Sequence, residues 1–405
     1  MNCSGWVSIL FMIASAFIYI VINPTLIHKS TSRHFSQQNA PVYFNYKSQT
    51  TKKNLLKSPE SFAILNDYIY MGLEDGSVVR ISTINLSDIN HLDDNDIELV
   101  IRTSELNPNK TAIPSLSQCA DMANRKDFKQ EYLCGRPLGL HFDDIGRLIV
   151  ADASYGIARI ESVDGSGINT HDNNLKNKLQ ITSLVSTLSG KDIIFANSVV
   201  VFNDLLYFTV SSDKFSRPEH MYEVMEAEGR GALYAYNFTS GSTALLVANI
   251  PFANGISLSS DHKKIFVAET SSARIMKYDI LEGTYTVLSD NMICIPDNIK
   301  LHNHVLWVGC SQIRSNFVDR VRRFPFLIKL FCSLPGVFFK WIVELVRSKD
   351  GIIVALDEIS GDERMVFYDY GGEAFKHVSE VQPLKGYLYV GSVYHNLKRI
   401  KINNK

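Results

Sequence analysis

The stretch that decides the fold is FANGISLSSDHKKIFVAETSSARIMKYDI, residues 252–280. Apolar residues alternate after Asn254-Gly255, a polar turn follows at residues 261–264, and the runs IFVAE and ARIMKYDI come next. This pattern predicts three short strands joined by tight turns, because strand residues alternate between the two faces of a sheet. The β-branched and aromatic residues of these runs also favour strands over helices. The polar Asn-Gly pair stands where the unit begins.

Copies of this unit recur along the chain, separated by insertions of variable length. There are six, at residues 58–81, 136–160, 195–212, 252–280, 295–311 and 379–402. No helical crossovers alternate with them, which excludes a doubly wound α/β fold. Small sheets that cover one another by radial packing form β-propellers. The sequence therefore predicts an all-β, six-bladed β-propeller over residues 51–405, with a β-sandwich as the structural alternative. Residues 42–46 are expected to pair into the last blade.

Residues 314–349, between the fifth and sixth units, do not follow the repeat. They contain eight Arg or Lys against two acidic residues, interleaved with aromatic side chains at Phe317, Phe324, Phe326, Phe331, Phe338, Phe339 and Trp341. This composition predicts a basic, amphipathic helical insertion. It is expected either to lie on a membrane surface, to roof the mouth of the channel, or to pack as a helix pair on the side of the propeller.

The N-terminal region differs from the rest of the chain, which has 405 residues, is 45% apolar and carries a formal net charge of −1. That balance predicts no nucleic-acid partner. Residues 1–27 carry no charge and residues 6–22 are almost continuously apolar, so we expect a cytosolic tip and an uncleaved signal-anchor helix. A cleaved signal peptide is the alternative, because Ala14-Ser15-Ala16 fits a cleavage site. The polar residues 28–50 are typical of a stalk.

These features predict a single-pass type II membrane protein of the endoplasmic reticulum or plasma membrane, with the propeller in the lumen or outside the cell. Sequons for N-glycosylation at Asn85, Asn109 and Asn237 agree with that orientation. Lys29 and Arg33 oppose it, since basic residues tend to stay on the cytosolic side.

The six cysteines are too few for a disulfide scaffold. Cys119 and Cys134 bracket a short polar segment, and an oxidising lumen would allow a disulfide that fixes this loop. Two free thiols are the alternative for this pair. The remaining cysteines of the predicted propeller, Cys294, Cys310 and Cys332, are expected to be buried apolar residues, because no pair has metal-ligand spacing.

The residues that begin the innermost strands should gather at one end of the channel. In four of the six units this position carries an amide or carboxylate oxygen: Glu60, Asn197, Asn254 and Asp297, with Asn298 beside the last. Ca²⁺ accepts oxygen ligands of this kind, whereas Zn²⁺ prefers His and Cys. A single Asn-Gly or Asp-Asn is usually a turn residue. The recurrence of such side chains at equivalent positions of four units nevertheless predicts a calcium site.

Several motifs resemble one known family. They are CGRPLGL (134–140), LIVADASYGIARI (148–160), FANSVVV (195–201), FANGISLS (252–259), VAETSSARI (267–275), IPDNI (295–299) and SEVQPLKGYLYVGS (379–392). They look like the strictosidine synthase-like family, and most of all its animal branch of adipocyte plasma membrane-associated proteins and hemomucins. The resemblance implies a six-bladed propeller related to paraoxonases and gluconolactonases, which are Ca²⁺-dependent ester and lactone hydrolases. By resemblance to the paraoxonase calcium site, the ligands fall on the same five residues.

The chain also departs from that family at catalytic positions. The glutamate of the plant synthases aligns with Ser379, one residue before Glu380, so strictosidine synthesis is not expected. The paraoxonase histidine pair aligns with Leu138 and Asp152, so no such dyad is expected. Asp152 is then a candidate carboxylate base, with a structural cap as its alternative role. His141 and His395 are further acid-base candidates, although a structural role is expected for both.

Two functions therefore stay open at the level of sequence. One is a membrane-anchored, calcium-dependent hydrolase of esters or lactones, with weak arylesterase-like activity. The other is a non-catalytic binding propeller in which Ca²⁺ braces the channel and the loops recognise a lipid, glycan or protein.

Overall fold

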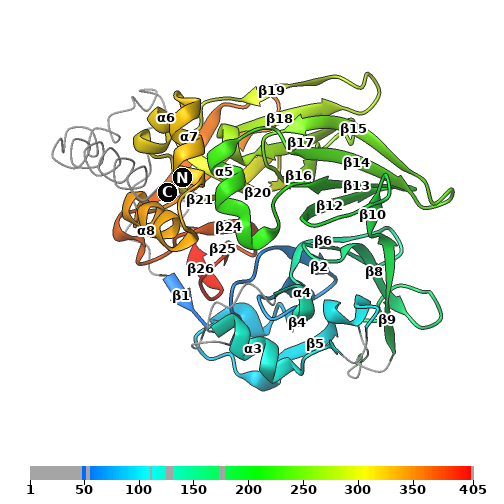
Figure 1. Cartoon of the computed structure of the whole chain (residues 1–405). Coiled ribbons are helices and arrows are strands. Elements are labelled where there is room, and N and C mark those ends of the chain that lie inside the picture. Colours follow the sequence, from blue (N-terminus) through cyan, green and yellow to red (C-terminus); the bar gives the residue numbers. More distant parts are fainter. Residues whose placement is uncertain are drawn as a thin grey trace.

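A computed structural model of the chain describes residues 48–51, 55–109, 112–124, 131–170, 172, 175 and 178–402. Within these ranges the fold is all-β and is built from six four-stranded antiparallel sheets and one two-stranded hairpin. Each predicted repeat unit coincides with one four-stranded sheet. The sheets are arranged side by side as in a propeller (Figure 1).

The first three sheets follow the chain in order, each with its strands hydrogen-bonded in sequence. The first contains β2 (Phe62–Leu65), β3 (Tyr68–Gly72), β4 (Ser77–Ser82) and β5 (Ile97–Arg102). The second contains β6 (Pro137–Phe142), β7 (Leu148–Asp152), β8 (Gly156–Ser162) and β9 (Leu179–Val185). The third contains β12 (Ala196–Phe202), β13 (Leu205–Val210), β14 (Gly231–Asn237) and β15 (Thr243–Ile250). The hairpin β10 (Thr187–Leu188) and β11 (Lys191–Asp192) lies between them in sequence.

The last three sheets repeat this pattern, with one exception in the sixth. The fourth contains β16 (Ala253–Leu258), β17 (Lys264–Glu269), β18 (Arg274–Asp279) and β19 (Tyr285–Ser289). The fifth contains β20 (Cys294–His302), β21 (Val305–Ile313), β22 (Gly351–Asp357) and β23 (Glu363–Asp369). The sixth contains β24 (Val378–Leu384), β25 (Tyr387–Ser392) and β26 (Lys398–Lys401), and its fourth strand is β1 (Ser48–Thr50) from the other end of the chain.

The pairing of β1 with β26 joins the beginning and the end of the described chain in one sheet. Ser48 lies opposite Ile400 and Thr50 opposite Lys398. Residues 42–46, which the sequence analysis assigned to this role, lie outside the described residues. The first and sixth sheets are also linked directly, because the backbone N–H of Phe62 donates to Oε1 of Glu380 at 2.7 Å.

The first strand of five sheets carries an irregularity near its beginning. The register shifts between Ala196 and Val199 in β12, between Ala253 and Ile256 in β16, and between Pro296 and Ile299 in β20; β6 and β24 shift at the equivalent places, between Pro137 and Gly139 and between Val378 and Val381. A bulge leaves extra residues unpaired and changes the direction of their side chains. The bulges therefore set where the side chains of the predicted calcium ligands point.

Neighbouring first strands approach each other so closely that glycine is required at two of these bulges. A Cβ on Gly139 would lie 2.6 Å from Cα of Ser198, and a Cβ on Gly255 would lie 2.4 Å from Cα of Asn298. Real Cβ atoms do not approach backbone to such distances, so any larger residue would push the sheets apart. The Asn254-Gly255 pair is thus fixed by sheet packing as well as by local backbone geometry.

Six helices are described, and they lie outside the repeat. Helices α3 (Leu116–Asn124) and α4 (Glu131–Cys134) precede the second sheet, and α5 (His220–Glu226) lies between β13 and β14. The insertion of residues 314–349 forms three helices rather than a pair: α6 (Asn316–Arg322), α7 (Pro325–Cys332) and α8 (Gly336–Val346). Helices α5 to α8 gather at one end of the sheets (Figure 1) and share an apolar cluster around Phe339. No helix among the described residues is both long and apolar enough to cross a membrane.

Both disulfides of the described residues tie down irregular parts of the chain. Cys119 in α3 and Cys134 in α4 are joined as predicted, with their Cα atoms 5.8 Å apart. Cys294 and Cys310 are joined as well, with Cα atoms 5.7 Å apart, so the prediction of two unpaired residues is wrong, although both are buried. Cys332 is the free cysteine of the described part. Spacing alone cannot reveal the second pair, because the register shift in β20 brings it together.

The disulfide pattern predicts the number of thiols that react in the denatured protein. Of six cysteines, only Cys3 and Cys332 should be alkylated in guanidinium without reductant, and all six after reduction. Intact mass spectrometry counts the adducts. Four adducts before reduction would show that one of the two disulfides does not form. In the native protein Cys332 should react slowly, since burial raises its pKa to about 11 and little thiolate is present at neutral pH.

Candidate metal site and the cavity around it

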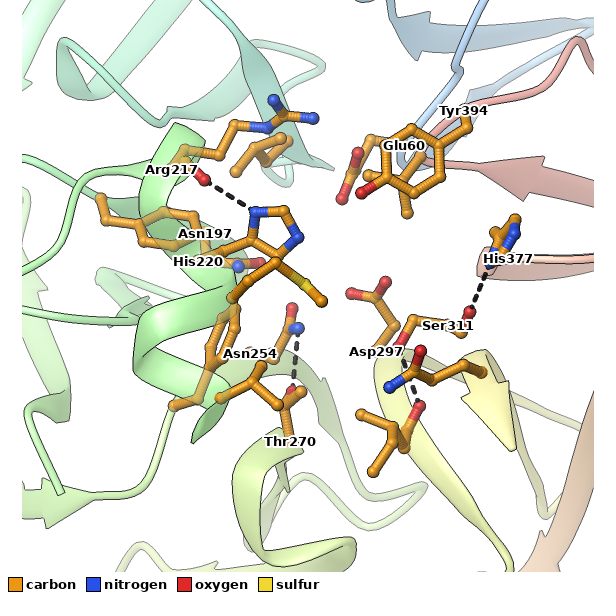
Figure 2. A pocket seen from close by; sticks show the side chains of 18 of the residues that line it. Glu60, Asn197, Arg217, His220, Asn254, Thr270, Asp297, Ser311, His377 and Tyr394 are labelled. Carbon is orange, nitrogen blue, oxygen red and sulfur yellow. Dashed lines mark hydrogen bonds between the residues drawn. The ribbon is translucent and has the colours of Figure 1, made fainter. Parts of the chain in front are cut away.

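Four of the five predicted calcium ligands lie around one cavity at the end of the inner strands. Glu60, Asn197, Asn254 and Asp297 all line it, and Figure 2 shows their side chains pointing towards its centre. Asn298 lies next to Asp297 in the same bulge, and all five residues are buried. The repeat analysis therefore identified residues that the fold brings together.

The amide groups of the three asparagines are held in one orientation by their nitrogen atoms. Nδ2 of Asn197 donates to Oγ of Ser211 at 2.9 Å, and Nδ2 of Asn254 donates to Oγ1 of Thr270 at 3.0 Å. Nδ2 of Asn298 donates to the backbone oxygen of Glu60 at 3.2 Å. These bonds leave each amide oxygen turned away from the nitrogen's partner.

The oxygen atoms at the other end of these amides have no hydrogen-bond partner among the described residues. Oδ1 of Asn197, Asn254 and Asn298 are all buried and unsatisfied. A buried polar atom without a partner usually costs about 1–3 kcal/mol, so three in one place demand an explanation. A cation in the cavity would give a partner to the oxygens of Asn197 and Asn254, which line it, because carboxamide and carboxylate oxygens are the ligands of Ca²⁺.

The two carboxylates of the set are in different environments. Oε2 of Glu60 accepts from Nη2 of the buried Arg136 at 2.7 Å. Burial, and next the nearby Glu60 carboxylate, raise the pKa of Asp297 well above its usual value. No group of three or more His, Cys, Asp or Glu side chains among the described residues is arranged to hold a metal. Amide oxygens therefore make up most of this candidate site.

The cavity around these residues is small and has apolar walls. Its volume is about 70 Å³, room for roughly five to seven water molecules at ~10–15 Å³ each. Leu138, Phe195 and Phe252 form a buried cluster at its side, together with Ala153. Such a space fits an ion with a few waters, and the body of a larger ligand has to lie elsewhere.

Two histidines that the sequence analysis did not single out line the same cavity. Nδ1 of His220, in α5, lies 3.0 Å from the backbone oxygen of Arg217, and Nδ1 of His377 lies 3.1 Å from that of Ser311. A carbonyl oxygen only accepts, so both Nδ1 atoms carry the hydrogen and both Nε2 atoms are acceptors. Burial lowers the pKa of His220 to about 3 and also lowers that of His377, which keeps both rings neutral at pH 7. Both come from segments outside the repeat motifs.

Asp152, the carboxylate base proposed from the sequence, does not line the cavity. Its side chain is fully buried and accepts three backbone N–H bonds, from Arg136 at 2.7 Å, Ser154 at 2.8 Å and Tyr155 at 3.1 Å. Burial raises its pKa, while these bonds act in the opposite direction. This geometry matches the alternative role of a structural cap.

The other candidate catalytic residues from the sequence lie outside the central cavity. Ser379 and Glu380 lie in the bulge of β24, where Oγ of Ser379 donates to the backbone oxygen of Pro59 and Glu380 binds Phe62. His141 lines a separate cavity farther along the inner strands, and burial lowers its pKa to about 4. His395 lines a hollow beside the central cavity. Glu380 is thus used in joining two sheets.

The sequons are accessible where they are described. The side chains of Asn85 and Asn109 are exposed, and Asn237 is half-buried at the end of β14. Thr111 of the second sequon lies outside the described residues.

Comparison of structures places the chain in a class of all-β, propeller-like proteins. A gluconolactonase from Xanthomonas campestris matches with a TM-score of 0.53 and 11% identity, covering 88% of this chain and 89% of that one. A calcium-binding protein, regucalcin, from Agrobacterium tumefaciens matches with a TM-score of 0.51 and 11% identity, covering 89% and 94%. At such low identity the likeness concerns the fold.

Comparison of sequences identifies the family more narrowly. The profile of the strictosidine synthase family matches residues 197–283. Adipocyte plasma membrane-associated protein of Salmo salar is 29% identical over 92% of this chain and 82% of its own length, and the human protein of that name is 29% identical over 84% and 74%. The Arabidopsis thaliana protein STRICTOSIDINE SYNTHASE-LIKE 3 is 29% identical over 84% and 81%. The comparisons thus confirm the resemblance to the strictosidine synthase family that the motifs indicated.

Proposed function

We propose that the six sheets form a closed six-bladed propeller that binds Ca²⁺ at its centre through Glu60, Asn197, Asn254, Asp297 and Asn298. The observation that carries this proposal is the set of three buried, unpartnered amide oxygens beside two carboxylates. One protein of similar fold, the regucalcin of Agrobacterium tumefaciens, is described as calcium-binding, which supports a calcium site in this chain. The pairing of β1 with β26 and the Glu380–Phe62 bond support closure of the ring.

The activity that this site favours is hydrolysis of an ester or lactone. A bound Ca²⁺ supplies a Lewis acid that polarises a carbonyl oxygen and stabilises the charge that develops on it. Phe195 and Phe252 exclude bulk water from that oxygen, and Ser211 and Thr270 keep the asparagine oxygens aimed at the cavity. Leu138 and Asp152 stand where the paraoxonases have their histidine pair, so other side chains provide the acid-base function here.

We assign to His220 the role of orienting the water used in hydrolysis. Its Nε2 accepts a hydrogen bond from a water in the cavity, because Nδ1 is occupied by the Arg217 carbonyl. A base is most effective when its pKa lies near the working pH, and the pKa of His220 is about 3. It therefore orients the water more than it removes a proton at neutral pH, and the expected activity is weak. A non-catalytic binding propeller with a structural Ca²⁺ is the alternative function.

The metal site is tested by calorimetric titration of Ca²⁺ into the purified chain and its variants. Loss of a residue that only supports a metal ligand commonly costs about 10–100-fold in metal affinity, so removing a ligand itself in Asn254→Ala or Asp297→Ala should weaken binding by at least about tenfold. Asn254→Asp keeps an oxygen in place and should retain binding. The exposed Asn95→Ala is the matched control and should change nothing. Unaltered affinity in both alanine variants would refute the site.

The hydrolase proposal is tested with phenyl acetate and a panel of lactones, with and without a chelator. Turnover should disappear with the chelator and return with Ca²⁺. His220→Ala should lower kcat/KM by about tenfold, below the usual range for a positioned base because this one is weak. The exposed His91→Ala is the control. If no substrate turns over but the chelator lowers the melting temperature, the binding-propeller alternative replaces the enzyme.

We also propose that the protein is a single-pass type II membrane protein whose propeller faces the lumen or the outside of the cell. Two disulfides in the described part support an oxidising compartment, and Asn85, Asn109 and Asn237 are available for glycans. The predicted anchor, residues 1–27, lies outside the described residues. The helices of residues 314–349 provide a second membrane contact, since α7 and α8 expose Phe326, Val337, Phe338 and Trp341.

The topology is tested in sealed microsomes. Glycosidase treatment should shift the electrophoretic mobility of the full chain, and replacing Asn85, Asn109 and Asn237 by Gln should abolish the shift. The propeller should resist added protease until detergent opens the vesicles. Digestion of the propeller in intact vesicles, together with no glycosidase shift, would place it in the cytosol.

A further inference from the structure

A second hollow opens directly beside the metal-ligand cavity. We call it the vestibule: it has a volume of about 490 Å³ and lies between α5, α8, the segment before β24 and the segment before β26. It shares six lining residues with the central cavity: Arg217, His220, Met221, Arg347, His377 and Tyr394. The two hollows therefore adjoin each other, and the vestibule has the volume of a small-molecule site, unlike the central cavity.

The walls of the vestibule carry more positive than negative charge. Arg217, Lys340, Arg347 and Lys376 line it, against one carboxylate, Glu344. Arg217 is paired with Glu131 at 2.6 Å, and Arg347 with Glu344 at 2.8 Å. Lys340 and Lys376 form no ion pair within the part of the chain that the structure describes. The walls thus hold two positive charges in excess.

Two histidines of the vestibule leave this charge balance unchanged. His220 and His377 have lowered pKa values, so they are neutral at pH 7 and add no charge. An anionic group bound here is held by Lys340 and Lys376, because charge-assisted hydrogen bonds to an anion are stronger than neutral ones.

Apolar side chains form the rest of the vestibule, and the apolar surface continues outwards along α8. Phe339, Val343 and Met221 line the hollow, with Pro218 beside them. On the outer side of α8, Phe338, Trp341 and Leu345 are exposed. A ligand that fits these walls combines an anionic group with an apolar chain.

We infer that the vestibule binds an anionic amphiphile: a molecule that joins a phosphate or carboxylate group to an acyl or alkyl chain. The anionic group lies against Lys340 and Lys376, and the apolar chain lies along Phe339 and Val343. This inference names the substrate class of the proposed hydrolase and rests on it for its catalytic meaning. An ester of such a molecule would lie beside the metal-ligand cavity at His220 and Tyr394, two of the six residues that both hollows share.

Binding is measured by calorimetry on the full chain in nanodiscs of neutral lipid, with octyl phosphate, octyl glucoside and inorganic phosphate as probes. Octyl phosphate should bind more tightly than either of the others, because only it satisfies both the charge and the apolar wall. The double variant Lys340→Gln with Lys376→Gln should weaken octyl phosphate binding by about tenfold or more. The matched control, Lys263→Gln with Lys277→Gln in the fourth sheet, should leave it unchanged.

Each alternative outcome overturns the inference. Equal binding of octyl phosphate and octyl glucoside would show that the site does not recognise the charge. Equal binding of octyl phosphate and inorganic phosphate would show that the site does not recognise the alkyl group. An unchanged affinity in the lysine double variant with a normal melting temperature would place the ligand elsewhere. Octyl phosphate contains no carboxylic ester, so this test is independent of turnover. Hydrolysis without anion preference refutes the vestibule alone, and anion binding without hydrolysis refutes the enzyme alone.

Discussion

The structure depends on the bulge at the beginning of its inner strands. A regular strand would point Asn254 and Gly255 to opposite faces of the sheet and pair both with β17. The bulge between Ala253 and Ile256 releases both residues from that pairing. Asn254 then turns towards the central cavity, while Gly255 lets the next strand approach to within contact of its backbone. One local irregularity thus supplies the ligand and the packing of the neighbouring sheet.

The same irregularity explains how buried polar atoms accumulate without destabilising the fold outright. At two bulges the second residue is used between sheets: Oγ of Ser198 accepts from the N–H of Ile256, and Glu380 accepts from the N–H of Phe62. The first residue of the bulges in β12 and β16 is an asparagine that lines the central cavity, where no described residue donates a hydrogen bond to its amide oxygen. A ring of strands can satisfy polar groups between neighbours but not on its own axis. The axis is therefore the natural place for an ion.

The repeat is the part of the molecule that sequence reasoning predicts well. Strand order and the gathering of four polar residues around one cavity follow from the same six copies, since equivalent positions in a repeat have equivalent environments. The Cys294–Cys310 disulfide could not be predicted, because it depends on a register shift that no sequence pattern marks. His220 and His377 were missed for a different reason. They come from connecting segments, and their place at the cavity is set by tertiary packing.

Asp152 lies in the repeat and was expected to act as a base, but its carboxylate is used to accept hydrogen bonds from the backbone. Its carboxylate closes the turn after β7 through Ser154 and Tyr155, and a carboxylate with those bonds has no free lone pair aimed at a substrate. The molecule thus has two parts whose sequences are constrained differently. The inner strands hold the proposed ligand set, and their close packing at Gly139 and Gly255 leaves little room for larger residues. Helices α5 and α8, together with the segments around Lys376 and Tyr394, form the walls above it and contribute nothing to sheet pairing. A relative could change those walls, and with them the ligand it accepts, while the proposed ion site beneath stayed the same.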